Sequence, residues 1–444
     1  MSKVIEYKCL NCGGPLQFDS SSQKIKCPYC DAEFDIEEVK SYNEELANAE
    51  PEKMEWDVNS KEAAEAELEG LNVYHCDSCG AEIIAHENTS ATICPFCESP
   101  VILKGRLSGV LKPDYVIPFK YDKDATKDAL KDFLKKKLFL PNVFRTENKV
   151  EEVKGLYEPF WIYDTNCAGR VDWKAKNVRT YTQGDYRVKE TKYYRIIREG
   201  SIGFDHIPVD GSSTMPDDLM ESIEPFDFAG AELFNAAYLA GHMSDKYDVD
   251  KDVCANRANQ RVREGTIDQF RSTIHGYDEV NYESSSLNLY DNTCHYALYP
   301  VWILNSKWKD KKFTFGMNAQ TGKMVGNLPC SPLKYALWFI GFYLLTGALL
   351  GLAAGFFIAN GMDDPSHGVL GGILVGALLG LITPIFFCRY HRKALKPVHE
   401  QHGAANYYRP GSMNITKARD IFLYRTVSRT KINTDNNRSG GPRR

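Results

Sequence analysis

The stretch CLNCGGPLQFDSSSQKIKCPYC, residues 9–30, holds two Cys-x-x-Cys pairs that are separated by 14 residues. A second stretch, CDSCGAEIIAHENTSATICPFC, residues 76–97, has the same spacing at an offset of 67 residues. Gly13 and Gly80 follow the second cysteine of each array, and both arrays end in Cys-Pro-aromatic-Cys. The sequence therefore carries an internal duplication of one small module.

This spacing is typical of a zinc ribbon. A two-residue gap lets both thiolates of a pair reach one ion at about 2.3 Å, and glycine eases the tight turn that follows. Two pairs complete a tetrahedron, and four thiolates leave no open coordination position, so both sites are expected to be structural. We predict two structural Zn²⁺ ions, one held by Cys9, Cys12, Cys27 and Cys30 and one by Cys76, Cys79, Cys94 and Cys97.

The alternative to metal is a disulfide framework. The N-terminus has no basic-then-apolar signal pattern, which indicates that the arrays stay in the cytosol. Thiols remain reduced there, and clustered Cys-x-x-Cys motifs are more often metal sites than disulfides. The isolated cysteines, including Cys294 beside His295, are expected to be buried, inert thiols.

Charge is segregated along the 444 residues. Residues 1–102 contain 7 Lys and Arg against 21 Asp and Glu, whereas residues 389–444 contain 13 against 3. The basic C-terminal segment suits anionic lipid or nucleic acid, and the acidic N-terminal segment repels both. Nucleic acid is therefore an unfavoured partner, because only the basic tail suits it electrostatically.

Two long apolar segments predict a membrane hairpin. Residues 335–359 and 369–388 lack charged side chains, and each is long enough to span a hydrocarbon core of about 30 Å. Asp363 and Asp364 lie in the short connection, whereas basic residues flank the outer ends. The positive-inside rule then predicts a cell-membrane protein with both termini in the cytosol. The basic residues expected to contact anionic lipid are Arg389, Arg392, Lys393 and Lys396.

Glycine recurs every four residues in both apolar segments. At that spacing it lets helix backbones approach closely, so that van der Waals packing holds helices together within lipid. We therefore expect glycine zippers, either within one hairpin or between chains, and the second case implies a homo-oligomer. The glycines are Gly347, Gly351, Gly355, Gly368, Gly372, Gly376 and Gly380. Neither segment contains a charge, which argues against a transport path.

The middle of the chain predicts a mixed domain. Alternating residues on both sides of a turn at 183–185 predict two antiparallel strands, and residues 123–138 and 249–274 predict helices. Interleaved Tyr, Lys and Arg at 179–198 also suit single-stranded nucleic acid, but such alternation is more typical of a half-buried sheet. A further helix is expected at 61–71, between the ribbons.

The chain is thus expected to be a multidomain α+β protein. Its segments are zinc ribbon 1 (1–35), an acidic, partly helical connector (36–71), zinc ribbon 2 (72–102), an α+β middle domain with antiparallel sheet (103–332), a transmembrane hairpin (333–390) and a basic cytosolic tail (391–444). The connector is either an acidic docking surface or, as charge runs more often are, a solvated spacer. No metalloprotease, nucleophile-elbow or dinucleotide-binding motif occurs, so the sequence does not indicate an enzyme.

The chain resembles a family of bacterial membrane-anchored proteins that bear a transcription-factor-IIB-type zinc ribbon and are sometimes labelled helicase-related. The resemblance rests on the ribbons, on Val116-Ile117-Pro118-Phe119, on residues 157–161 and on residues 224–250 with Tyr238-Leu239-Ala240-Gly241. It implies zinc binding by the eight ribbon cysteines. Members are often encoded near flotillin-like (stomatin/prohibitin) or phage-shock-type membrane proteins, which implies such a protein as a partner. No helicase motor accompanies the ribbons, and their duplication departs from single-ribbon relatives.

These features lead to two hypotheses of function. The first is a non-enzymatic membrane adaptor, or scaffold, in which the ribbons and the middle domain bind proteins and the hairpin places them at the bilayer. The second is a membrane-tethered nucleic-acid-binding protein, which the acidic charge of the ribbons opposes. An enzyme or transporter with an unfamiliar site in the middle domain is a third class, for which no known motif is present.

Overall fold

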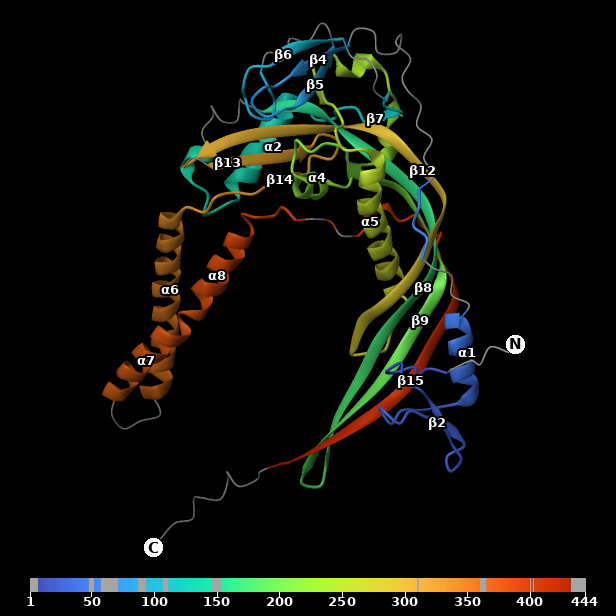
Figure 1. The fold of residues 1–444 in the computed structure, drawn as a ribbon. Coiled ribbons are helices and arrows are strands. Elements are labelled where there is room, and N and C mark those ends of the chain that lie inside the picture. The colour runs from blue at the N-terminus through green and yellow to red at the C-terminus, as the bar shows by residue number, and fades with distance from the viewer. Residues whose placement is uncertain are drawn as a thin grey trace, which may run out of the picture.

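The computed structural model describes residues 7–47, 52–56, 71–86, 93–106, 111–145, 153–309, 311–359, 365–399, 401 and 403–432. Figure 1 shows a long, strongly curved sheet with a helical hairpin near one end, so that the molecule has the outline of an arch. The main sheet has twelve strands, and a separate three-stranded sheet belongs to ribbon 1. The predicted α+β fold with antiparallel sheet is confirmed.

Four long strands form the curved part of the sheet: β8 (Lys154–Gln183), β9 (Tyr186–Asp210), β12 (Glu279–Trp308) and β15 (Asn414–Lys431). β8 pairs antiparallel with both β9 and β12, and β15 pairs with β9 at the edge. Gly184, with a φ of 58°, makes the turn between β8 and β9, so the predicted strand pair is confirmed. Register shifts in these pairings are β-bulges, which bend the strands.

Strand β15 differs from the tail expected at 391–444. Its residues pair with β9 from Asn414, opposite Ser201, to Lys431, opposite Tyr186. The physical reason is a strand pattern hidden in a basic sequence, since Ile421 and Leu423 are buried and β-branched residues are frequent around them. Much of the basic segment therefore completes the sheet instead of forming a separate tail.

Two predicted helices are confirmed. The segments 123–138 and 249–274 form α2 (Lys123–Lys135) and α5 (Lys251–Arg271). α5 lies on the concave side of the sheet (Figure 1), and its apolar side, which includes the fully buried Phe270, belongs to the main hydrophobic core. The burial of this apolar side holds the helix on the sheet.

A buried ion pair and a tyrosine hydroxyl connect α5, the segment around Glu224 and the chain that follows the hairpin. The side chains of Arg261 and Glu224 are 1% and 0% exposed, and their Nη2 and Oε2 atoms are 2.6 Å apart. The Tyr407 hydroxyl donates a hydrogen bond to Glu224 Oε2 at 2.8 Å. Because removal of one partner would leave a buried charge unpaired, these three segments are fixed to one another.

The remaining elements are short. Ribbon 1 has β1 (Gln17–Asp19), β2 (Lys24–Lys26) and β3 (Glu33–Phe34) and is followed by α1 (Ile36–Ala47). Ribbon 2 has β4 (Leu71–His75), β5 (Glu82–His86) and β6 (Ile102–Arg106). The middle domain adds β7 (Tyr115–Val116), α4 (Asp217–Ile223), β10 (Glu232–Leu233), β11 (Met243–Asp245), β13 (Lys311–Asn318), β14 (Met324–Gly326) and the 3₁₀ turns η2 (Asn142–Arg145), η3 (Phe228–Gly230), η4 (Ala236–Leu239) and η5 (Ala405–Tyr407). Of the helix expected at 61–71, all but Leu71 lies outside the described residues.

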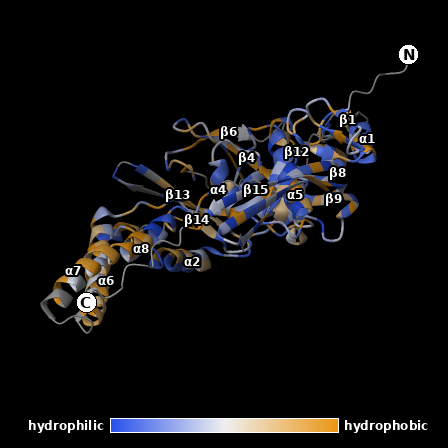
Figure 2. Ribbon diagram, turned by 90° about the horizontal axis from the view of Figure 1, so that it is seen from below, coloured by the Kyte–Doolittle hydropathy of each residue, from blue (hydrophilic) through white to orange (hydrophobic). Residues whose placement is uncertain are grey.

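The hairpin consists of α6 (Pro332–Ala359), α7 (Pro365–Leu379) and α8 (Ile382–Lys393). Two stretches, Pro332–Ile358 and Val369–Lys393, are long and apolar enough to cross a membrane. Figure 2 shows that apolar residues are much denser on α6 and α7 than on the body of the molecule. The structure therefore contains the two apolar helical segments that the sequence predicts.

The second segment, 369–388, is not one straight helix. The chain breaks between α7 and α8 because Pro384 has no N–H to bond the Gly380 carbonyl, four residues earlier. The Thr346 hydroxyl of α6 lies 3.0 Å from that carbonyl oxygen and 2.7 Å from the Phe342 carbonyl oxygen, so the two acceptors share its proton. α8 departs from the direction of α7 at this break (Figure 1).

Candidate metal centres

Each metal centre begins with a cysteine pair in a tight backbone turn. In ribbon 1 the Gly13 N–H donates to the Cys9 carbonyl at 2.9 Å, and Gly13 has a φ of 73°. In ribbon 2 Gly80 and Cys76 repeat this turn, with a 2.8 Å hydrogen bond and a φ of 81°. Glycine adopts these positive φ values without steric cost. The duplicated sequence thus has a duplicated backbone geometry.

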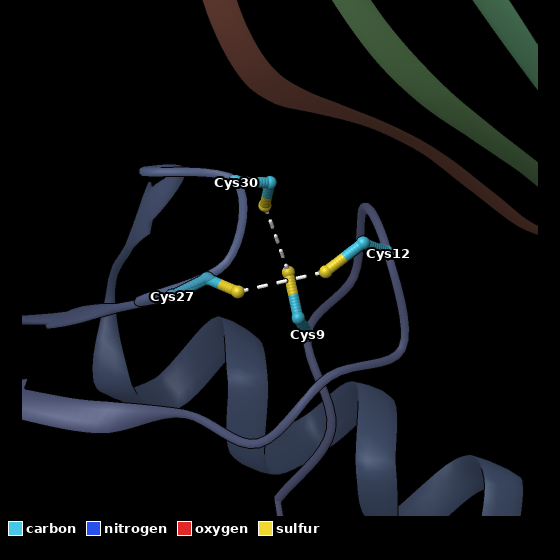
Figure 3. A group of neighbouring side chains, drawn as sticks. All are labelled: Cys9, Cys12, Cys27 and Cys30. Carbon is cyan, nitrogen blue, oxygen red and sulfur yellow. Dashed lines mark hydrogen bonds between the residues drawn. The ribbon is translucent and has the colours of Figure 1, made fainter.

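The predicted ligands of ribbon 1 converge on one point. Figure 3 shows the four cysteine side chains directed toward a common centre. The sulfur atoms lie within 4.8 Å of one another, and the Sγ–Sγ distance is 3.7 Å for Cys9–Cys30 and 3.5 Å for Cys12–Cys27. An ion about 2.3 Å from four tetrahedral thiolates places those sulfurs about 3.8 Å apart. The sulfur positions therefore fit zinc.

Ribbon 2 has an equivalent sulfur cluster. Its Sγ–Sγ distances are 3.4 Å for Cys76–Cys97 and 3.7 Å for Cys79–Cys94. Burial raises the pKa of the Cys94 thiol well above its usual range, so a thiolate there requires a neighbouring cation. The prediction of two structural zinc ions is confirmed by both clusters. Four sulfur ligands fill each ion's coordination sphere and leave no position for a substrate.

Ribbon 2 is built into the main sheet. Its strand β5 pairs with β11, so ribbon and middle domain share one sheet. Asn305 of β12 donates from Nδ2 to the carbonyl oxygens of Pro95, at 3.0 Å, and Phe96, at 2.9 Å. Lys154 of β8 donates from Nζ to the Cys94 carbonyl at 3.2 Å. Two strands of the middle domain therefore bind the second cysteine pair directly.

Ribbon 1 lies on the outer face of β9 and β15 (Figure 1). Within the described residues its three strands form their own sheet and do not pair with the main one. Arg195 of β9 contacts the Tyr42 hydroxyl of α1 and pairs with Glu283 at 2.7 Å. The apolar contact joins Leu10, Val39 and Tyr42 to Ile197, Ile421 and Leu423. Among the described residues, ribbon 1 is therefore attached to the sheet through side chains.

A group of buried carboxyl groups lies beside ribbon 2. Glu158 of β8 is fully buried, and neither of its carboxyl oxygens has a hydrogen-bond partner among the described residues. Asp245 of β11 accepts a hydrogen bond from Ser212 Oγ at 2.5 Å, and Lys246 pairs with Glu82 of ribbon 2 at 2.7 Å. Burial raises the pKa of Glu158 and raises the pKa of Asp245 to about 7. Both groups hold protons at pH values where exposed carboxyls are ionised.

The predicted glycines lie where α6 meets α7. A Cβ added to Gly372 would lie 2.5 Å from the Gly351 carbonyl oxygen and 2.8 Å from the Gly355 Cα. A second close contact between backbones involves Gly347, Gly376 and Gly380. The surroundings of Gly368 lie outside the described residues. The described glycine contacts therefore join two helices of one chain.

The predicted lipid-contact residues lie at one end of the hairpin. They are exposed at the end of α8 and just beyond it: Arg389, Arg392, Lys393 and Lys396. Phe139 contacts both Tyr335 of α6 and His391 of α8, with ring centroids 5.5 and 5.9 Å apart. The first and last turns of the hairpin therefore lie together, and contact of this end with lipid stays a prediction.

The adjacent Cys294 and His295 do not form a reactive pair in this structure. Successive side chains of a strand point to opposite faces, and both residues lie in β12. Burial raises the pKa of Cys294 to about 12, so its thiol stays protonated. His295 instead faces Asp114, with 3.7 Å between Nδ1 and Oδ2.

Several residues around the metal centres carry no recognisable signal in the sequence. Asn305 lies 210 residues from the Pro95 carbonyl that it binds, and Lys154 lies 60 residues from Cys94. A single Asn or Lys within a strand is an ordinary sequence feature. The buried Glu158 is equally inconspicuous, because glutamate is usually exposed.

Comparison with known proteins finds one informative similarity. The chain is 33% identical over 338 residues to the uncharacterized protein YdjG of Bacillus subtilis (strain 168). The alignment covers 76% of this chain and 94% of that protein. No protein-family model matches the chain, and no solved structure matches it.

Proposed function

We propose that this chain, which belongs to the same family as YdjG of Bacillus subtilis, is a non-enzymatic, membrane-anchored zinc-ribbon scaffold that assembles protein partners at a bilayer. The observation that carries the proposal is the closed sulfur coordination of both metal centres. Such an ion stabilises a small binding module and offers no position to a substrate. A protein with two such modules and two apolar helices is suited to holding partners at a membrane.

Exposed apolar side chains on both ribbons support protein binding. On ribbon 1 Phe18 is 55% exposed and Tyr29 73%. On ribbon 2 Ile93 is 49% exposed, Ile102 59% and Leu103 55%. Apolar groups gathered on small modules are typical of interaction surfaces. The acidic charge of the N-terminal segment favours partners with a basic surface.

Anchoring through the hairpin is the second part of the proposal. Basic residues stand at both outer ends, with Lys334 at the start of α6 and the four lipid-contact residues at the end of α8. By the positive-inside rule both ends lie in the cytosol, which agrees with reduced, zinc-bound cysteines. Close glycine contacts hold α6 against α7. Accessibility of ribbon 1 and of the C-terminus to protease in sealed, right-side-out vesicles would contradict this orientation.

The scaffold proposal is tested by isolating the full chain from native membranes after mild crosslinking. We expect a stoichiometric protein partner, and the family resemblance implies a flotillin-like or phage-shock-type membrane protein. The double variant Phe18→Ser/Tyr29→Ser should lose the bound partner and keep both zinc ions. Leu233→Ser is the matched control, because Leu233 is 76% exposed on β10, outside ribbon 1.

Two outcomes would contradict the scaffold proposal. One is a chain that carries no stoichiometric partner and runs as a lone monomer in mild detergent. The other is equal partner loss in the ribbon variant and in Leu233→Ser, because contact through ribbon 1 requires a difference between them. A complex that contains only further copies of this chain would instead identify a homo-oligomer.

A further inference from the structure

One described part of the acidic connector is bound to the middle domain. Between α1 and ribbon 2 the structure describes residues 52–56, Glu-Lys-Met-Glu-Trp, which we call the connector peptide. Figure 1 shows it as a short blue segment beside β12. The side chains of Met54 and Trp56 pack against the main hydrophobic core. The connector peptide is therefore attached to the body of the molecule between the two ribbons.

Strand β12 binds the main chain of the connector peptide. The Lys53 N–H donates to Asn288 Oδ1 at 2.7 Å, and the Lys53 carbonyl accepts from the Leu289 N–H at 3.0 Å. The Glu55 carbonyl accepts from Asn292 Nδ2 at 2.6 Å. Lys53 and Asn288 also form a parallel β-bridge. Main-chain contacts of this kind are how an extended peptide adds to the edge of a sheet.

No other described strand covers this part of the β12 edge. β8 pairs with one edge of β12 from Glu279 to Ile303. On the other edge, β7 and β13 pair only with residues from Ala297 onward. An uncovered edge presents unpaired N–H and C=O groups to an extended segment, and the connector peptide lies on that stretch.

Helix α5 adds contacts to side chains. Asn259 donates from Nδ2 to the Met54 carbonyl at 3.0 Å, and its Oδ1 accepts from Trp56 Nε1 at 2.7 Å. One turn later, Arg263 pairs with Glu52, with 2.7 Å between Nη2 and Oε2. The residues that bind the connector peptide form what we call the connector site: Asn259, Arg263, Asn288, Leu289 and Asn292.

The chemistry of the connector site defines what it binds. The Trp56 ring meets the Tyr163 ring edge to face, with centroids 4.8 Å apart. A tryptophan with a satisfied indole N–H is a typical anchor of peptide and protein recognition. Arg263 favours a carboxylate at the position of Glu52, four residues before the tryptophan. The site is thus suited to an extended segment with this acidic and aromatic spacing.

We infer that α5 and β12 form a peptide-binding site whose occupant is the connector peptide, and that this occupancy holds ribbon 1 on the sheet. With the peptide bound, the four residues 48–51 join it to Ala47 of α1 and span at most about 18 Å. With the peptide released, the 23 residues 48–70 join Ala47 to Leu71 of β4 and reach at most about 85 Å. The effective concentration of a tethered module falls with about the −3/2 power of tether length, so release raises the detached fraction of ribbon 1 roughly tenfold.

The first test measures peptide binding by the full chain in mild detergent. The probe is a fluorescent synthetic peptide with the sequence of residues 50–58, and its binding is followed by anisotropy. In the native chain the connector peptide competes at an effective concentration of about millimolar, so we expect the probe to bind weakly. Trp56→Ala in the chain should empty the site and strengthen probe binding roughly tenfold or more. Adding Asn259→Ala should abolish this gain, and Tyr282→Ala, at an exposed residue of β12, should behave like the native chain.

The second test measures how often ribbon 1 leaves the sheet. Hydroxyl-radical footprinting reports the exposure of Tyr42, Ile421 and Leu423, which are buried where ribbon 1 meets the sheet. We expect Trp56→Ala to raise their labelling roughly tenfold while both zinc ions stay bound. Added probe fills the site without restoring the short tether, so labelling should stay high. If Trp56→Ala impairs folding, Trp56→Phe keeps an aromatic ring, loses the bond to Asn259 and should give intermediate values in both tests.

Three results would overturn this inference. Equal probe binding by the native chain and by the Trp56 variants, or binding by neither, would exclude a separable peptide site. Unchanged labelling of the buried contact residues in those variants would exclude a hold on ribbon 1. Protection restored by added probe would assign the effect to the filled site and not to the tether. These measurements involve no protein partner and no membrane, so their failure is distinct from failure of the proposed function.

Discussion

The two ribbons share a sequence spacing and a metal centre, but they are joined to the molecule in different ways. Ribbon 2 continues the main sheet through β5 and β11, and Asn305 binds its second cysteine pair. Ribbon 1 keeps its own sheet and touches β9 and β15 through side chains. The comparison shows that the same zinc module can form part of a larger sheet, as ribbon 2 does, or pack as a separate unit on the surface of that sheet, as ribbon 1 does.

The largest expected effect comes from removing one zinc ion from either ribbon. Cys94→Ser and Cys27→Ser should each lower the zinc content from two ions per chain to one. A structural zinc ion contributes roughly 10–16 kcal/mol in finger peptides, which is about the whole stability of a domain. We expect Cys94→Ser to unfold the attached end of the main sheet. Cys27→Ser should leave the unfolding transition of the sheet nearly unchanged.

Zinc content measured by mass spectrometry and thermal unfolding of the detergent-solubilised chain check this pair of variants. Cys330→Ser is the control, because Cys330 belongs to neither sulfur cluster. Equal destabilisation by the two ligand variants would show that both ribbons are integral to the sheet.

The second effect is a pH dependence of the local stability of ribbon 2, which we do not expect in ribbon 1. Folding raises the pKa of Asp245 to about 7, and burial also raises the pKa of Glu158 and Asp210, above the value near 4 of an unfolded carboxyl. The folded state therefore binds protons more tightly, and the free energy of unfolding falls as pH rises from about 4 to about 7. For Asp245 the limit is about 4 kcal/mol. The negative charge of Asp248 also raises the pKa of Asp245, and the Lys246 ammonium pairs with Glu82.

Hydrogen exchange at pH-corrected rates measures this effect in each ribbon. Between pH 5 and pH 8 we expect protection of ribbon 2 to decrease, while that of ribbon 1 changes little. Asp245→Asn should flatten the pH dependence, and the exposed Asp128→Asn should not. Protection of ribbon 2 that increases with pH would show that the buried carboxyls are ionised and stabilised in the folded protein.

The third effect concerns the strand that binds the ribbon 2 turn. Asn305→Ala removes the hydrogen bonds from Nδ2 to the Pro95 and Phe96 carbonyl groups, which we expect to cost about 1–3 kcal/mol. Denaturant unfolding should show that loss, with faster exchange around Cys94. Asn281→Ala changes an exposed residue of the same strand and should have little effect. Similar losses in both variants would mean that the strand, and not the bond to the ribbon, determines the change.

The smallest effect is expected at the attachment of ribbon 1. Tyr42→Phe keeps the ring and removes the hydroxyl that Arg195 contacts, at a cost of about 0.5–1.5 kcal/mol. Limited proteolysis should release ribbon 1 faster, while ribbon 2 stays protected. Tyr29→Phe is the control, because that side chain is 73% exposed. Unchanged release in Tyr42→Phe would indicate that apolar contact alone holds ribbon 1.

The sequence predicts those features that depend on short-range patterns. The zinc ligands are set by spacing within 22 residues, and the hairpin is set by two uninterrupted apolar segments. α2 and α5 follow from helical periodicity. In each case the residues that determine the structure are neighbours in the chain, so a local pattern is sufficient.

The arrangement of these parts could not be predicted because it depends on distant pairs. Strand β15 pairs with residues more than 200 positions earlier, and its basic composition resembles that of a lipid-binding tail. The break before α8 depends on Pro384, a single residue within an otherwise continuous apolar segment. Asn305 and Glu158 acquire their roles only when other strands bury them.

The position of β15 in the chain has a consequence for biosynthesis. A ribosome makes ribbon 1 first and residues 414–431 after the apolar helices, yet Ile421 and Leu423 form part of the surface on which ribbon 1 rests. Ribbon 1 can bind zinc as soon as it is synthesised. The surface that it packs against is incomplete until β15 pairs with β9. The attachment surface is therefore complete only after synthesis of the hairpin, and a chain that ends before residue 414 would keep the β9 contacts of ribbon 1 and lack those of β15.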